Sequence, residues 1–124
     1  MNPIRFGIVG FGSMALNHAG SLLTAAPHAR LCAVATKNEK NLAILRTMPG
    51  GENVAVFDTP QAMYRSGAID AVLIASPHRA HVRQALEAFA CGMHVLLEKP
   101  VGVSTKEARL LDAAAKESGR AFGV

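Results

Sequence analysis

A glycine-rich turn between a short apolar stretch and a helical pattern most constrains what this chain can fold into. The stretch Ile4–Val9 is rich in β-branched and aromatic residues, which favour a β-strand. The sequence Gly10-Phe11-Gly12-Ser13-Met14-Ala15 follows directly, and a helical pattern begins at Ser13. We therefore predict a strand, a tight turn and the N-terminus of a helix, in that order.

The small residues in this turn have the spacing Gly-x-Gly-x-x-Ala, which matches the dinucleotide-binding fingerprint. Gly10 permits the sharp turn out of the strand, and Gly12 lacks the Cβ that would keep a pyrophosphate from the backbone. Ala15 is small enough for the helix to pack on the strand. The helix N-terminus offers unpaired N–H groups and a partial positive charge of about half a unit to a phosphate. The alternative is a glycine turn that joins a strand to a helix in some other α/β protein.

Length and composition indicate one globular domain that spans residues 1–124. Half of the residues are apolar and 18% are charged, which excludes a disordered chain. The N-terminus lacks the residue order of a signal peptide, and no apolar run is long enough to span a membrane, so we expect a cytoplasmic protein. Cys32 and Cys91 are far apart in the sequence and are expected to be reduced core residues.

The net charge of +4 comes from scattered Lys and Arg residues. No basic cluster is interleaved with aromatic residues, and Tyr64 is the only tyrosine, so a nucleic-acid-binding surface is not expected. A small anionic ligand accounts for the mild positive excess equally well.

Apolar runs alternate with helical patterns along the whole chain. The predicted strands are Ile4–Val9, Leu31–Thr36, Val54–Phe57, Ile69–Ala75, Met93–Leu97 and Ala121–Val124. The predicted helices are Ser13–Ala25, Asn38–Met48, Pro60 to Gly67 with Thr59 as N-cap, His78–Cys91, and one from a Ser104/Glu107 capping box to Ser118. This alternation predicts an α/β fold with a doubly wound parallel sheet (a Rossmann fold) between two layers of helices.

In such a sheet, ligands bind beyond the carboxyl ends of the strands, where the strand order reverses. Polar or conformationally special residues follow four of the predicted strands, and all four groups should line the same rim. They are Gly10, Phe11, Gly12, Ser13 and Met14 after the first strand, Thr36 and Lys37 after the second, Ser76, Pro77 and His78 after the fourth, and Glu98, Lys99 and Pro100 after the fifth. This convergence predicts one binding crevice.

These segments closely resemble the glucose-fructose oxidoreductase / inositol dehydrogenase / rhizopine catabolism (Gfo/Idh/MocA) family. The resemblance rests on the glycine turn, on Ser76-Pro77-His78-Arg79-Ala80-His81 and, most specifically, on Gly92-Met93-His94-Val95-Leu96-Leu97-Glu98-Lys99-Pro100. It covers the whole chain and implies the N-terminal nucleotide-binding domain of an NAD(P)-dependent oxidoreductase acting on sugars, inositols and related alcohols. The family's C-terminal domain, which holds much of the substrate site, is expected to be absent from this chain.

The resemblance implies a catalytic role for Lys99. An ammonium group beside the nicotinamide can hydrogen-bond the substrate oxygen and stabilise the charge that develops there as hydride moves. Pro100 fixes the turn that aims Lys99, and we assign Glu98 to orienting this turn or a ribose. The structural alternative is a solvated lysine paired with Glu98.

The residues after the second strand bear on the choice of cofactor. Sites that prefer NAD place a carboxylate there for the ribose 2′-OH. This chain has Thr36 and Lys37, and a hydroxyl and a cation suit a 2′-phosphate, so we predict NADP(H) in preference to NAD(H). The alternative is that Lys37 is an ordinary solvated residue before the next helix.

Histidines and a cysteine in the pattern His78-x-x-His81 and Cys91-x-x-His94 raise the question of a metal site. The helix between the two pairs is ~20 Å long at about 1.5 Å per residue, whereas four zinc ligands must lie within about 2 Å of one ion, so we predict no metal site. The resemblance implies a cofactor or substrate contact for His81. Its alternative is a residue in the first turn of the helix that bonds a local carbonyl, and we expect His94 to be structural.

Three classes of function remain open at this point. The chain is a nicotinamide-dependent oxidoreductase or the cofactor-binding part of one, a nucleotide-binding module without chemistry of its own, or a domain that holds another cofactor such as S-adenosylmethionine. The third class is disfavoured, because a methyl donor would not explain the segment Glu98-Lys99-Pro100. We expect the isolated chain to bind the cofactor without turning over a sugar or polyol, and we expect no membrane partner and a possible homo-oligomer.

Overall fold

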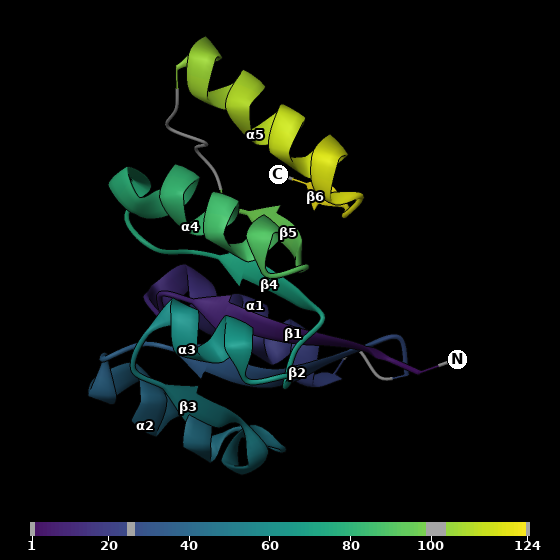
Figure 1. Ribbon diagram of the computed structural model, residues 1–124. Helices are drawn as coiled ribbons and strands as arrows, with labels where there is room; N and C mark the ends of the chain where they lie inside the picture. Colours follow the sequence, from purple (N-terminus) through teal and green to yellow (C-terminus); the bar gives the residue numbers. More distant parts are fainter. Residues whose placement is uncertain (1, 25–26, 99–103, 124) are drawn as a thin grey trace.

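Six parallel strands form one sheet in the order β3-β2-β1-β4-β5-β6 in the computed structural model, which describes residues 2–24, 27–98 and 104–123 (Figure 1). The strands are β1 (Ile4–Val9), β2 (Ala29–Ala35), β3 (Ala55–Phe57), β4 (Ala71–Ile74), β5 (His94–Leu97) and β6 (Phe122–Gly123). The helices are α1 (Ser13–Thr24), α2 (Glu39–Thr47), α3 (Pro60–Arg65), α4 (His78–Ala90) and α5 (Thr105–Ser118), with a short 3-10 helix over Gly51–Asn53. The predicted doubly wound parallel sheet is confirmed.

The strand order reverses between β1 and β4. Strands β2 and β3 follow β1 on one side of the sheet, whereas β4, β5 and β6 lie on the other. In the β1–β4 pair, Phe6 lies opposite Ala71 and Val9 lies opposite Ile74, so the two strands end side by side. This pair is therefore the switch point at which a doubly wound sheet binds its ligands.

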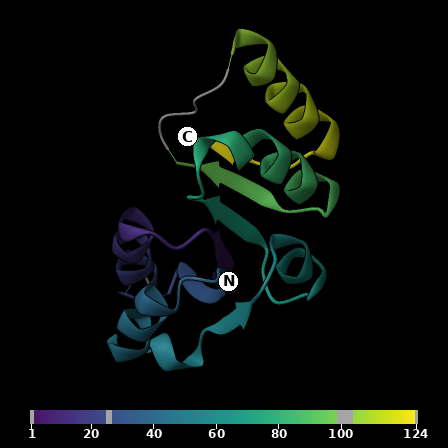
Figure 2. The same cartoon turned by 90° about the vertical axis from the view of Figure 1, so that its left-hand side faces the viewer.

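Alternate residues of the strands pack against two separate layers of helices. Ile8 belongs to a buried cluster that includes Ala15 and Ala19 of α1, together with a leucine of α2. Its neighbour Val9 faces the opposite way, into a cluster that includes Met63 of α3 and Leu111 of α5. Figure 2 shows α1 and α2 on one side of the sheet and α3 on the other. The near-continuous apolar runs of the sequence reflect burial on both faces.

Local sequence signals begin and end the helices as predicted. Thr59 caps α3, and its side chain accepts a hydrogen bond from the Ala62 N–H at 3.2 Å. Ser104 and Glu107 form the predicted capping box of α5, which ends at Gly119. The apolar residues of α4 at helical spacing, Val82, Ala85, Leu86 and Phe89, pack in the core cluster that includes the sheet.

The start of β2 is the clearest difference from the prediction. The strand begins at Ala29, two residues before the predicted Leu31, because Ala29 and Arg30 pair with Ile4 and Arg5 of β1. Backbone pairing thus extends the strand beyond its apolar run. The short 3-10 helix at Gly51–Asn53 was also not predicted.

Three predicted absences concern only the residues that the structure describes. No group of three or more His, Cys, Asp or Glu side chains there is arranged to hold a metal ion. No helix in those residues has the length and apolar character needed to cross a membrane. Cys32 and Cys91 are free thiols. Cys32 packs against the core as predicted, but the predicted core position is wrong for Cys91, which is exposed because it caps the C-terminus of α4.

Candidate cofactor site

The turn after β1 packs directly against the loop after β4. Gly10 has a φ of +76°, a left-handed conformation that L residues with a side chain rarely adopt. A Cβ at Gly10 would lie 2.7 Å from the Ser76 Cα and 2.8 Å from the Ser76 backbone nitrogen. Glycine is therefore required here both by the turn and by the close approach of Ser76, and the site residues predicted after the first and fourth strands meet.

Open space surrounds Gly12 on the outer side of the same turn. No described atom lies within 4 Å of the position that a Cβ would take. The Gly12 carbonyl accepts a hydrogen bond from the Leu16 N–H at 3.2 Å, which starts α1, and the first turn of α1 contains no acidic residue. A phosphate can thus approach the positive end of the helix without meeting a side chain at Gly12 or a like charge.

Two side chains of α4 hold the loop after β4 by hydrogen bonds to Ser76. The hydroxyl of Ser76 donates a hydrogen bond to Gln84 Oε1, and the Nε2 of His81 lies 2.5 Å from the Ser76 carbonyl oxygen. Since a carbonyl only accepts, the His81 Nε2 carries the proton and donates it. The His81 side chain is buried, with 1% of its surface exposed. This hydrogen bond matches the alternative in which His81 bonds a local carbonyl. A direct contact between His81 and a cofactor stays a prediction.

The residues after β2 are tied to the glycine turn through the main chain of Phe11. The Asn41 side-chain amide donates to the Phe11 carbonyl oxygen at 2.7 Å, and the Asn38 amide donates to it at 3.4 Å. The Phe11 side chain is buried in the core, so only its main chain is available to a cofactor, and that contact stays a prediction. Thr36 Oγ1 accepts a hydrogen bond from the Asn38 N–H at 3.0 Å, and Lys37 is exposed.

The residue after β5 is tied to α1. The Nε2 of His18 lies 2.6 Å from Oε2 of Glu98, and the Glu98 N–H donates to the Ile74 carbonyl oxygen at 3.0 Å. Glu98 is thereby held at the same rim as the glycine turn. The predicted residues Lys99 and Pro100 lie outside the described residues, as do the side chains of Ser13, Met14 and His78.

Four polar residues at this rim were missed by the sequence analysis: His18, Asn38, Asn41 and Gln84. A signal for His18 existed, because it stands three residues after Ala15 and one before Ala19 on a predicted helix, beside the buried stripe. Asn38 and Asn41 follow the second strand closely enough to face the same rim. His94 lies at the other end of β5 and accepts a hydrogen bond from the Ala121 N–H at its Nδ1, which confirms its structural role.

A model of the oxidoreductase family with an NAD-binding Rossmann fold, Gfo/Idh/MocA, matches residues 4–124. The chain belongs to this family. The resemblance inferred from the glycine turn and the Glu98-Lys99-Pro100 segment is thus confirmed, and so is the Rossmann fold. The part of the family that the chain matches is its NAD-binding Rossmann fold.

Individual members of the Gfo/Idh/MocA family are similar over nearly the whole chain. The inositol 2-dehydrogenase of Rubrobacter xylanophilus is 37% identical over 94% of this chain, and the D-glucoside 3-dehydrogenase of Escherichia coli is 31% identical over 96%. The solved structure of scyllo-inositol dehydrogenase from Lactobacillus casei, with NAD(H) and scyllo-inositol bound, is 28% identical and superimposes with a TM-score of 0.85 over 98% of this chain and 35% of its own. This chain spans about a third of the length of these relatives.

Proposed function

We propose that this chain holds the nicotinamide dinucleotide of an oxidoreductase that acts on a sugar, an inositol or a related alcohol or carbonyl compound. The observation that carries the proposal is the meeting of separate strand ends at one rim. Gly10 lies against Ser76, Asn41 bonds Phe11, and Glu98 reaches His18. Family members named for sugar and inositol substrates support the substrate class.

The residues at the rim fit a dinucleotide in three places. The open space at Gly12 and the N-terminus of α1 suit the pyrophosphate, and Thr36 and Lys37 after β2 suit the ribose on the adenosine side. Glu98 after β5 then lies on the nicotinamide side of the switch point, where its carboxylate is an acceptor for hydroxyl groups. When bound, the nicotinamide ring accepts or donates the hydride.

Lys99 is the residue that we assign to the substrate oxygen. It follows Glu98, which lies at the rim, directly in the sequence. An ammonium donates hydrogen bonds and places a positive charge beside the oxygen, which becomes negative as hydride adds to the carbonyl carbon. In the direction of reduction it can supply the proton to the same oxygen.

For the cofactor itself we propose a preference for NADP(H). Thr36 and Lys37 place a hydroxyl and a cation after β2, and the nearest carboxylate along the chain is Glu39, in the first turn of α2. The Lactobacillus casei relative was solved with NAD(H), so both cofactors must be compared.

The test is a parallel titration of the 124-residue chain with NADH and with NADPH, in which binding is measured by cofactor fluorescence or calorimetry. Saturable binding of one or both supports the proposal, and binding of neither overturns it. Because the chain spans about a third of its relatives, we expect it to bind cofactor without oxidising a polyol or sugar. Steady-state reduction of the cofactor by the isolated chain would contradict this second point.

A further inference from the structure

The contact between His18 and Glu98 joins two parts of the chain that are 80 residues apart. His18 lies in the second turn of α1, and Glu98 follows β5. Strand β4 lies between β1 and β5 in the sheet, so the contact connects the two sides of the switch point between β1 and β4. The His18 and Glu98 side chains are 37% and 22% exposed, which leaves the pair accessible to a ligand at the rim.

The chemistry of the pair fixes which atoms are engaged. An ionised carboxylate only accepts hydrogen bonds, so His18 donates its Nε2–H to Oε2 of Glu98 at 2.6 Å. Among the contacts of the described residues, none engages the second oxygen, Oε1. The Glu98 N–H is bonded to Ile74, so the residue is held through both its main chain and its side chain. One carboxylate oxygen is therefore fixed, and the other is available to a hydroxyl donor.

We propose that His18 is a positioning residue that aims the Glu98 carboxylate at the ribose hydroxyls on the nicotinamide side of the cofactor. This inference rests on the proposed function. The glycine turn receives the pyrophosphate, and the residues after β2 receive the adenosine. The second nucleoside must then lie over β4 and β5, where Glu98 stands. His18 itself touches Glu98, and it acts on the ligand through that carboxylate.

Three ligands of increasing length separate this role from a general structural one. ADP carries the adenosine and the pyrophosphate, ADP-ribose adds the second ribose, and NADH adds the nicotinamide. We expect His18→Leu to weaken the binding of ADP-ribose and NADH by roughly tenfold, the size expected for one hydrogen bond to a charged group, and to leave ADP binding unchanged. Titration of the full 124-residue chain by NMR makes even weak ADP binding measurable.

Two further variants complete the design. His18→Gln keeps an N–H donor near the position of Nε2 and should restore most of the affinity for ADP-ribose. Once Glu98 is changed to Ala, adding His18→Leu should weaken ADP-ribose binding no further, because His18 acts only through the carboxylate. Thermal unfolding of each variant shows that it is folded, and if His18→Leu fails to fold, His18→Gln and Glu98→Ala still carry the test.

The possible failures are distinguishable. If the unmodified chain binds none of the three ligands, the proposed function is overturned, and the role of His18 with it. If the chain binds all three but His18→Leu weakens ADP as much as ADP-ribose, the positioning role is wrong while the proposed function stands. Additive losses in the His18→Leu/Glu98→Ala double variant would likewise overturn the positioning role.

Discussion

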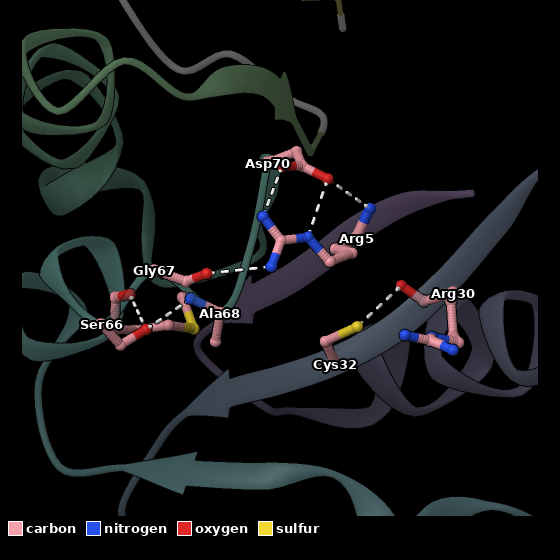
Figure 3. A network of polar contacts seen from close by, with 8 residues as sticks. Arg5, Arg30, Cys32, Ser66, Gly67, Ala68 and Asp70 are labelled. Atoms are coloured by element: carbon pink, nitrogen blue, oxygen red, sulfur yellow. Dashed lines mark hydrogen bonds and ion pairs between the residues drawn. The ribbon is translucent and has the colours of Figure 1, made fainter. Parts of the chain in front are cut away.

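The guanidinium of Arg5 and the carboxylate of Asp70 join β1 to the segment before β4 by two side-chain hydrogen bonds (Figure 3). They lie at the amino-terminal end of the strands, opposite the glycine turn. The Arg5 Nε and one terminal nitrogen lie 3.1 and 2.8 Å from the two carboxylate oxygens, and the Arg5 backbone N–H adds a third bond at 3.0 Å. The remaining guanidinium nitrogen donates to the Gly67 carbonyl oxygen. The strand pair that carries the switch point is thus fixed at both ends, by this pair and by the Gly10–Ser76 contact.

This pair predicts a specific loss of stability in acid. The hydrogen bond from the Arg5 side chain, and then the one from its backbone N–H, holds the pKa of Asp70 below its ordinary value of 3.8. The unfolded chain binds the proton more readily, so the contribution is complete above about pH 4 and is lost as the pH falls through the lowered pKa. We expect Asp70→Asn to lower the Tm at pH 7, with a difference from the unmodified chain that shrinks below about pH 4. Asp112→Asn, which removes a surface pair on α5, is the control, and a difference for Asp70→Asn that is independent of pH would contradict the assignment.

Gly10→Ala is expected to destabilise the fold. The left-handed backbone alone costs an L residue about 1–2 kcal/mol, and the added methyl group meets the main chain of Ser76, which cannot rotate away. Urea unfolding measures the loss of free energy. Gly20→Ala is the matched control, because its Cβ enters open space on α1 and a helical alanine should raise stability by about 0.5–1 kcal/mol. Equal unfolding midpoints for the Gly10→Ala variant and the unmodified chain would refute the close packing of the two loops.

His81→Ala separates the two roles considered for this residue. If the ring chiefly holds the Ser76 carbonyl, its removal leaves that oxygen without its donor and should cost about 1–3 kcal/mol of stability, together with a loss of NADH affinity. If the ring chiefly contacts the cofactor, affinity falls while stability is unchanged. We expect the first outcome in paired urea unfolding and NADH titrations, and His28→Ala, at an exposed histidine, should change neither quantity.

Lys37→Ala tests the proposed cofactor preference. An exposed cation beside the 2′-phosphate should contribute to NADPH binding alone, so we expect NADPH affinity to fall by roughly tenfold and NADH affinity to stay the same. Lys40→Ala removes an exposed cation one turn further along and should have a smaller effect. An equal loss of affinity for both cofactors, or no loss for either, would show that Lys37 does not bind the 2′-phosphate.

Much of the fold followed from the sequence because local signals and burial agree. Strands buried on both faces leave continuous apolar runs, and caps such as Thr59 and Ser104 mark helix starts by their own hydrogen bonds. The start of β2 did not follow, because Ala29 and Arg30 are held in the strand by pairing with β1 rather than by their own side chains.

The candidate site was predictable in its main-chain parts and less so in its side chains. The spacing of Gly10 and Gly12 identified the turn, and the left-handed backbone at Gly10 is a geometry that favours glycine. The supporting contacts, His18 with Glu98 and Asn41 with Phe11, join residues 80 and 30 positions apart. Such pairs depend on the strand order and on helix rotation, which no local pattern encodes.

Gly12→Ala, titrated with NADH alongside the unmodified chain, tests most directly that this rim binds a dinucleotide. The new methyl group meets no described atom within 4 Å, so the Tm should hardly change, but it occupies the space through which a pyrophosphate must approach the backbone. We predict a variant that is as stable as the unmodified chain and binds NADH at least about tenfold more weakly. NADH binding of equal strength by the two proteins would contradict the account.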